Sequence, residues 1–142
     1  MTPRMRPLAL IAGVLAVTAL VSPVVVRAAG TPAPAVSFTD MTGTTVALSS
    51  LKGQVVLLDF WASWCIPCRR SFPEVDAMQQ SLRGRGVVAY AIGVDEDAKQ
   101  ARAFLAEHPH TIPVALDPKG TLAAAFKLTA MPTSIILDRE GR

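Results

Sequence analysis

The stretch from Trp61 to Cys68 reads WASWCIPC and holds both cysteines of the 142-residue chain, two residues apart. The run before it, VVLLDF at residues 55–60, is short, apolar and partly β-branched, which is typical of a buried strand. After it, apolar residues recur at roughly helical spacing, at Phe72, Val75, Met78 and Leu82. Cys65 is therefore predicted to lie at a strand-to-helix turn, where free N–H groups and the helix dipole favour a thiolate.

Two cysteines at this spacing allow three interpretations. A structural zinc site needs about four ligands, and the sequence has no second Cys pair or Cys/His pair at zinc-finger spacing. An inert structural disulfide would close so short a loop that it would restrict the unfolded chain little. The spacing, the neighbouring Trp64 and Pro67, and the strand-to-helix setting favour the third interpretation, a redox-active dithiol.

The segment Asp59–Cys68 resembles the active site of the thioredoxin superfamily. With Pro73 and the later Met131-Pro132-Thr133, residues 36–142 are similar to its bacterial extracytoplasmic branch, the TlpA/ResA/CcmG-like thiol-disulfide oxidoreductases. A lone CxxC is a weak signal, but a CxxC combined with a distant Pro-Thr before an apolar strand is specific. The resemblance implies a thioredoxin-like α/β fold, in which helices flank a mixed central sheet and an N-terminal β-hairpin precedes it.

The catalytic roles follow from this resemblance and from position. Cys65, nearer the helix start, is expected to attack a client disulfide, and the more buried Cys68 is expected to resolve the mixed disulfide. Asp59 matches the buried aspartate of thioredoxin, which accepts the proton of the resolving cysteine. Burial without a partner would raise the pKa of this carboxyl. The alternative role for Asp59 is to cap a buried backbone group.

A second element of the site is implied near the end of the chain. By resemblance, Met131-Pro132 is a cis peptide bond that faces the dithiol and leaves the backbone of Met131 free to pair with a substrate strand. The alternative is an ordinary trans proline at a strand entry. Besides Pro132 as a catalytic residue, the resemblance implies a set of substrate-binding residues: Trp64, Ile66, Pro67, Met131 and Thr133.

The sequence departs from the resembled family at one position. Many TlpA/ResA-like proteins carry glutamate three residues after the second cysteine, where this chain has Ser71. The difference weakens a cytochrome c-specific assignment and favours Asp59 as the group that handles the proton.

Residues 1–28 are predicted to be a secretory signal. Arg4 and Arg6 precede an uncharged apolar stretch, and Val26-Arg27-Ala28 suits cleavage after Ala28. An uncleaved signal anchor formed by residues 7–26 is the alternative. Residues 29–35 are predicted to be a linker, and residues 36–142 one thioredoxin-like domain in the periplasm or another extracytoplasmic space.

Charge excludes one class of function. The net charge of +3 comes from 14 Lys and Arg against 11 Asp and Glu, and the three arginines of the signal account for the excess. The exported part is therefore formally neutral and has no electrostatic footprint for nucleic acid.

The rest of the chain predicts further helices and strands and two short polar segments. We expect helices over residues 66–82 and 98–107 and strands over residues 87–94 and 111–116. Asp95-Glu96-Asp97 is interpreted as a solvated helix start and His108-Pro109-His110 as a surface turn, so no metal site is predicted.

The end of the sequence, Arg139–Arg142, is typical of a hairpin turn, and the resembled family continues with another strand and helix. We therefore expect those C-terminal elements to be missing from this sequence.

The function expected is reduction of disulfides in exported client proteins, of the cytochrome c or copper-site assembly type. A membrane thiol donor of the DsbD/CcdA type would supply electrons, and no cofactor beyond the Cys65–Cys68 disulfide is expected. We expect a monomer. The alternatives are a Cu(I) metallochaperone that uses the same cysteines and a disulfide-donating oxidase.

Overall fold

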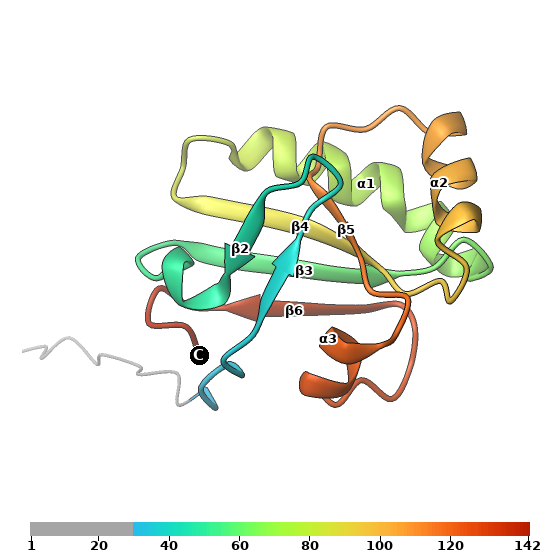
Figure 1. Ribbon diagram of the computed structural model, residues 1–142. Coiled ribbons are helices and arrows are strands. Elements are labelled where there is room, and N and C mark those ends of the chain that lie inside the picture. Colours follow the sequence, from blue (N-terminus) through green and yellow to red (C-terminus); the bar gives the residue numbers. More distant parts are fainter. Residues whose placement is uncertain (1–29) are drawn as a thin grey trace, which may run out of the picture.

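The computed structural model describes residues 30–142 and places a four-stranded sheet between two layers (Figure 1). The predicted signal or anchor, residues 1–28, lies outside the described residues. The strand order is β5-β4-β3-β6, where β5 is Val114–Leu116, β4 is Val87–Gly93, β3 is Val55–Trp61 and β6 is Thr133–Leu137. β3, β4 and β5 are parallel, and β6 runs antiparallel to β3. This is the mixed sheet that the sequence predicts.

Two helices cover one face of the sheet. α1 spans Ile66–Leu82 and α2 spans Ala98–Glu107. Their buried apolar side chains form one core with alternate residues of the strands: Leu57, Trp61, Ala89, Ala91 and Val114. Successive strand residues point to opposite faces, so both faces of β3 are buried, which explains why its sequence is almost continuously apolar.

The N-terminal hairpin covers the other face together with α3, Thr121–Ala125. The hairpin consists of β1, Ser37–Thr39, and β2, Thr45–Ala47, and a 3₁₀ helix, η1, follows over Leu48–Leu51. Gly43 permits the turn because its φ is +90°. The hairpin is therefore confirmed as part of the second core of the domain.

β5 is shorter than the predicted strand over residues 111–116. Pro113 has no N–H to donate to a ladder, and the N–H groups of Thr111 and Ile112 donate to the Asp76 carboxylate on α1, at 2.8 and 2.7 Å. A side chain of a neighbouring helix thus takes the hydrogen bonds that a longer strand would have used.

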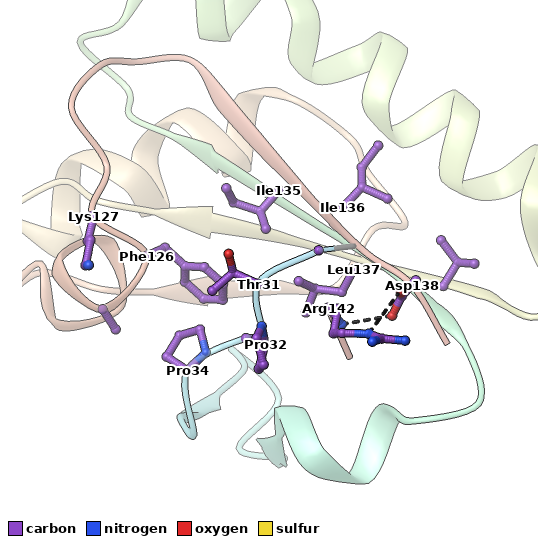
Figure 2. Close-up of a pocket in the computed structure, with 14 residues that line it drawn as sticks. Thr31, Pro32, Pro34, Phe126, Lys127, Ile135, Ile136, Leu137, Asp138 and Arg142 are labelled. Carbon is purple, nitrogen blue, oxygen red and sulfur yellow. Dashed lines mark hydrogen bonds and ion pairs between the residues drawn. The ribbon is translucent and has the colours of Figure 1, made fainter. Parts of the chain in front are cut away.

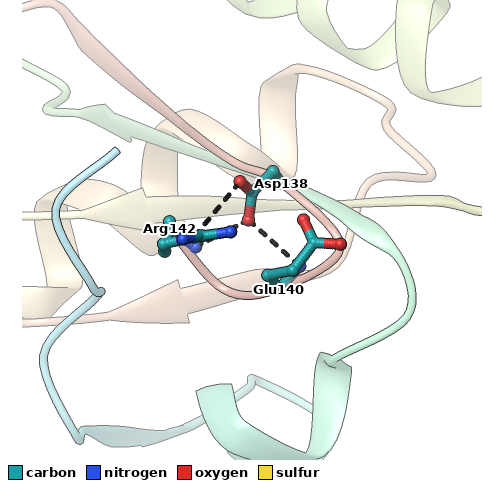
Figure 3. Close-up of polar contacts among 3 residues, drawn as sticks. All are labelled: Asp138, Glu140 and Arg142. Carbon is teal, nitrogen blue, oxygen red and sulfur yellow. Dashed lines mark hydrogen bonds and ion pairs between the residues drawn. The ribbon is translucent and has the colours of Figure 1, made fainter. Parts of the chain in front are cut away.

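β6 is an edge strand of the described sheet, and a tight turn follows it (Figure 3). The Asp138 carboxylate accepts the N–H groups of Glu140 and Arg142 at 3.0 and 2.9 Å, and its other oxygen lies 3.8 Å from the Arg142 guanidinium. The chain therefore reverses direction after β6, as the turn-like sequence predicts. In residues 30–142 we find no helix with the length and apolar character needed to cross a membrane.

Candidate active site

The two cysteines lie where β3 passes into α1. Cys65 is the N-cap of α1, and its sulfur accepts the N–H of Cys68 at 3.3 Å. The cysteines form a disulfide, with their Cα atoms 5.2 Å apart. Pro67 lies in the first turn, where its missing N–H removes no helical hydrogen bond. The predicted strand-to-helix turn is therefore present, and both cysteines lie at the start of the helix.

This position determines the chemistry of the first cysteine. When the disulfide is reduced, a thiolate on Cys65 would meet the free N–H groups and the positive end of the dipole of a 17-residue helix. Such a setting lowers the pKa of a cysteine thiol and makes it nucleophilic near neutral pH. Cys68 is the more buried of the two, 1% exposed against 5% for Cys65, in the order predicted for a resolving and an attacking cysteine.

Asp59 lies on the β3 face that packs against α1. Its β3 neighbours on that face, Leu57 and Trp61, belong to the same core cluster as both cysteines. The side chain is 4% exposed, and burial raises the pKa of its carboxyl. Ser134 opposes this shift in part, because its hydroxyl donates to Asp59 Oδ1 at 2.7 Å.

The partner of Asp59 comes from the antiparallel strand. Asp59 stands opposite Ser134 of β6 and opposite Ala91 of β4. Within residues 30–142 the Asp59 carboxylate accepts no other hydrogen bond, so it does not cap a backbone N–H there. A buried acid with a raised pKa and one neutral hydrogen-bond partner is a candidate proton acceptor.

Among the remaining predicted residues, Trp64 and Met131 line one groove, and Met131 packs against the core cluster that contains both cysteines. Met131–Pro132 is a cis peptide bond, as the resemblance implied, and the Thr133 hydroxyl donates to the carbonyl of Ala130 at 2.8 Å. A groove of about 410 Å³ runs between Trp64 and Met131, with Val94, Ala123, Leu128, Thr129 and Ala130 also lining it. Trp64 and Ile66 are each 62% exposed. Their apolar side chains are therefore open to solvent and do not form part of the core.

Ser71, at the position of the family glutamate, lies in the second turn of α1. Its hydroxyl donates to the carbonyl of Cys68 at 3.2 Å, which is a local helical contact. Asp59, buried on the face of β3 that packs against α1, stays the predicted proton acceptor.

A larger cavity of about 890 Å³ lies elsewhere (Figure 2). Its walls come from residues 30–34, the segment Ala125–Lys127, and β6 with the turn after it. None of the predicted catalytic or substrate-binding residues lines it, so its size does not mark the active site. No cluster of three or more metal-ligating side chains occurs among residues 30–142.

Sequence reasoning missed two residues that contact Asp59 or the turn before Cys65. The sequence predicts that Asp95 belongs to a solvated helix start, but the residue is 2% exposed and accepts hydrogen bonds from Ser63. Of the three acidic residues, Asp97 caps α2 by accepting the N–H of Lys99. Ser134, which donates to Asp59, is the second. The signal that could have identified Ser134 is its place on β6, directly opposite Asp59 of β3.

A disulfide between the N-cap residue and the first turn of a helix, on a thioredoxin-like sheet with a buried carboxyl, is an arrangement that can carry out thiol-disulfide exchange. The Redoxin family matches residues 28–142, and the chain belongs to that family. The sequence-based resemblance to thioredoxin-like oxidoreductases is thereby confirmed.

Individual relatives agree on the class. The thiol-disulfide oxidoreductase ResA of Bacillus subtilis is 31% identical over 113 residues, which cover 80% of this chain and 63% of ResA. The thioredoxin-like protein YneN of the same organism is 36% identical, over 79% of this chain and 66% of YneN. The chain thus spans just under two thirds of the length of these curated relatives. A crystal structure from Chlorobium tepidum, assigned to the thiol:disulfide interchange protein DsbE, is 40% identical with a TM-score of 0.72, covering 80% of this chain and 81% of that one.

Proposed function

We propose that this oxidoreductase reduces disulfides in exported client proteins, of the kind that require a reduced cysteine pair for cytochrome c or copper-site assembly. The observation that carries the proposal is that Cys65 lies at the N-terminus of α1 while the adjoining strand β3 holds the buried Asp59, whose pKa burial raises. The first group supplies a thiolate and the second removes the proton that the resolving step releases.

The reaction takes place in two exchanges. The Cys65 thiolate attacks one sulfur of a client disulfide, forms a mixed disulfide and releases the first client thiolate. Asp59 then accepts the Cys68 proton, directly or through water, and the Cys68 thiolate attacks the Cys65 sulfur. The second client thiolate leaves, and two electrons have passed from the dithiol to the client. The groove between Trp64 and Met131 would hold the client chain beside the sulfurs.

The proposed location is extracytoplasmic, on the basis of the signal-like residues 1–28. Because such compartments are oxidising, the dithiol would need electrons from a membrane thiol protein of the DsbD/CcdA type. The protein would act as a monomer, with the Cys65–Cys68 disulfide as its only redox group.

The reduction potential of the Cys65–Cys68 pair is the deciding measurement, made by equilibration with glutathione or dithiothreitol. A potential near about −270 mV, as in thioredoxin, would support a reductant. A potential near about −120 mV, as in DsbA, would make the protein a disulfide donor and overturn the proposed direction. If no reversible couple existed, the Cu(I) interpretation would replace the redox one.

A trapping experiment tests the order of the two cysteines. Cys68→Ser should accumulate mixed disulfides between Cys65 and client proteins, because the resolving thiol is gone. Cys65→Ser is the matched control, since it keeps one thiol but should trap nothing. Trapping by the control and not by Cys68→Ser would reverse the assignment.

A further inference from the structure

The carboxylate of Asp95 is buried against Ser63, two residues before Cys65, and has no part in the exchange described above. Asp95 follows β4 in the loop before α2 and is 2% exposed. A carboxylate at this depth is unfavourable unless its oxygens are well hydrogen-bonded. In the described part of the chain the only ion pair joins Arg142 to Asp138, so no cation neutralises Asp95 there.

Ser63 provides the hydrogen bonds that Asp95 accepts. The Ser63 N–H donates to Oδ1 at 3.2 Å and to Oδ2 at 3.0 Å, and the Ser63 hydroxyl donates to Oδ1. Hydrogen bonds to an ionised carboxylate are among the stronger ones in proteins. The contact, here called the Ser63–Asp95 clamp, ties the loop after β3 to the loop after β4, 32 residues further along the chain.

The clamp lies two residues from the nucleophile. The N–H of Cys65 donates to the carbonyl of Ala62 at 3.1 Å, which closes a tight turn with Ser63 inside it. Val94, the residue before Asp95, donates its N–H to the carbonyl of Trp61 at 2.9 Å. A shift of Ser63 would therefore move Cys65 relative to the N-terminus of α1, the feature that stabilises its thiolate.

The clamp also joins two segments that line the groove between Trp64 and Met131. Trp64 is the chain neighbour of Ser63, and Val94 is the chain neighbour of Asp95; both line the groove that reaches Met131. One buried contact thus sets the place of the nucleophile and of the apolar surface next to it.

We propose that Asp95 is a positioning residue for thiol-disulfide exchange, which acts through Ser63 to hold Cys65 at the N-terminus of α1. The inference concerns the reactivity of the dithiol itself, so it depends neither on the client nor on the direction of electron flow. A test that measures Cys65 directly can therefore fail independently of the proposed function.

The test compares two neutral substitutions in the full-length chain. In a Cys68→Ser background Cys65 is the only thiol, and its alkylation by iodoacetamide is followed against pH. Asp95→Ala and Asp95→Asn both remove the charge, but only asparagine can accept the Ser63 N–H and pair with its hydroxyl. At pH 7 we expect Asp95→Ala to react about tenfold more slowly than Asp95→Asn, which corresponds to a thiol pKa about one unit higher.

Equal rates for the two variants would overturn the proposal. The same conclusion would follow if both reacted faster than the parent by one common factor, since the carboxylate would then act only as a nearby charge. Asp76→Asn is the matched control, because Asp76 is also a buried carboxylate that accepts backbone N–H groups, and it joins α1 to the segment before β5. This substitution should leave the pH dependence of Cys65 alkylation unchanged.

A second pair of variants covers the case in which Asp95→Ala does not fold. Ser63→Ala loses the hydroxyl of the clamp, whereas Ser63→Thr keeps it; both keep the backbone N–H. Slower alkylation of Ser63→Ala than of Ser63→Thr is expected, and equal rates would overturn the proposal.

Discussion

Replacing Ser134 by alanine should destabilise the protein in a manner that depends on pH through Asp59. The Ser134 hydroxyl is the single hydrogen-bond donor to the Asp59 carboxylate within residues 30–142, at 2.7 Å. A hydrogen bond to a charged group contributes about 1.5 to 3 kcal/mol, against about 0.5 to 1.5 kcal/mol for a neutral pair. Ser134 is itself exposed, so water can replace part of the lost bond, and we expect about 1.5 kcal/mol at pH 8.

The direction of the pH dependence follows from the raised pKa of Asp59. Because the folded pKa lies above the ordinary value of 3.8, the folded state binds the proton more tightly than the unfolded state. The stability contributed by this carboxyl is therefore full below pH 3.8 and is lost as pH rises through the folded pKa. Ser134→Ala removes a bond that favours the charged form, so its loss of stability should grow with rising pH.

The assay is urea unfolding of the disulfide-bonded protein at several pH values, so that the thiols do not titrate. Ser81→Ala is the matched control, because the Ser81 hydroxyl donates to a backbone carbonyl on α1 and its removal should act equally at every pH. In an Asp59→Asn background the pH dependence of Ser134→Ala should disappear. A loss that is the same at pH 4 and pH 8, or that falls as pH rises, would refute the reasoning.

Three further substitutions have defined outcomes. Asp59→Asn should be more stable than the wild type at pH 8 in urea unfolding, since the substitution removes a buried charge. It should also slow the resolving step in stopped-flow oxidation by about 100-fold, a typical loss for a missing general base. An unchanged rate of exchange would exclude Asp59 as the proton acceptor. Asp76→Asn should lose about 1 to 3 kcal/mol at pH 7. Burial alone would raise the pKa of Asp76, but its four hydrogen bonds hold that pKa below 3.8, so the loss should fade as pH drops through the folded pKa; a loss independent of pH would contradict this. Phe72→Ala should lower the free energy of unfolding in urea by about 3 to 5 kcal/mol, because Phe72 is 2% exposed and packs edge-on against Trp61 and Phe104. A decrease below about 1 kcal/mol would show that neighbouring side chains fill the space left by the ring.

Local sequence patterns predicted the parts of the structure that depend on neighbouring residues. The apolar run at residues 55–60 forms β3, and the helical spacing after Cys68 forms α1 to Leu82. The hairpin around Gly43 was likewise predictable, since a turn signal separates two apolar segments. In each case the physical cause lies within a few residues of the element.

Long-range contacts could not be predicted in the same way. Asp95 lies in an acidic run that looks solvated, and only the parallel pairing of β3 with β4 brings it against Ser63. The strand over residues 111–116 was predicted too long, because nothing in that segment shows that a helix carboxylate takes two of its N–H groups. Local patterns cannot indicate a partner that belongs to another element.

The same limit explains why the CxxC segment alone does not define this active site. Two buried carboxylates, Asp95 and Asp59, each accept hydrogen bonds from one serine, and each pair joins distant parts of the chain, 32 and 75 residues apart. The Ser63–Asp95 contact requires β3 and β4 to be paired, and the Ser134–Asp59 contact requires β3 and β6 to be in register. The geometry of the nucleophile and the proton affinity of its neighbour are thus properties of the assembled sheet. A partly folded chain with an intact CxxC would keep both thiols but lack both contacts, so its reactivity should differ from that of the native dithiol.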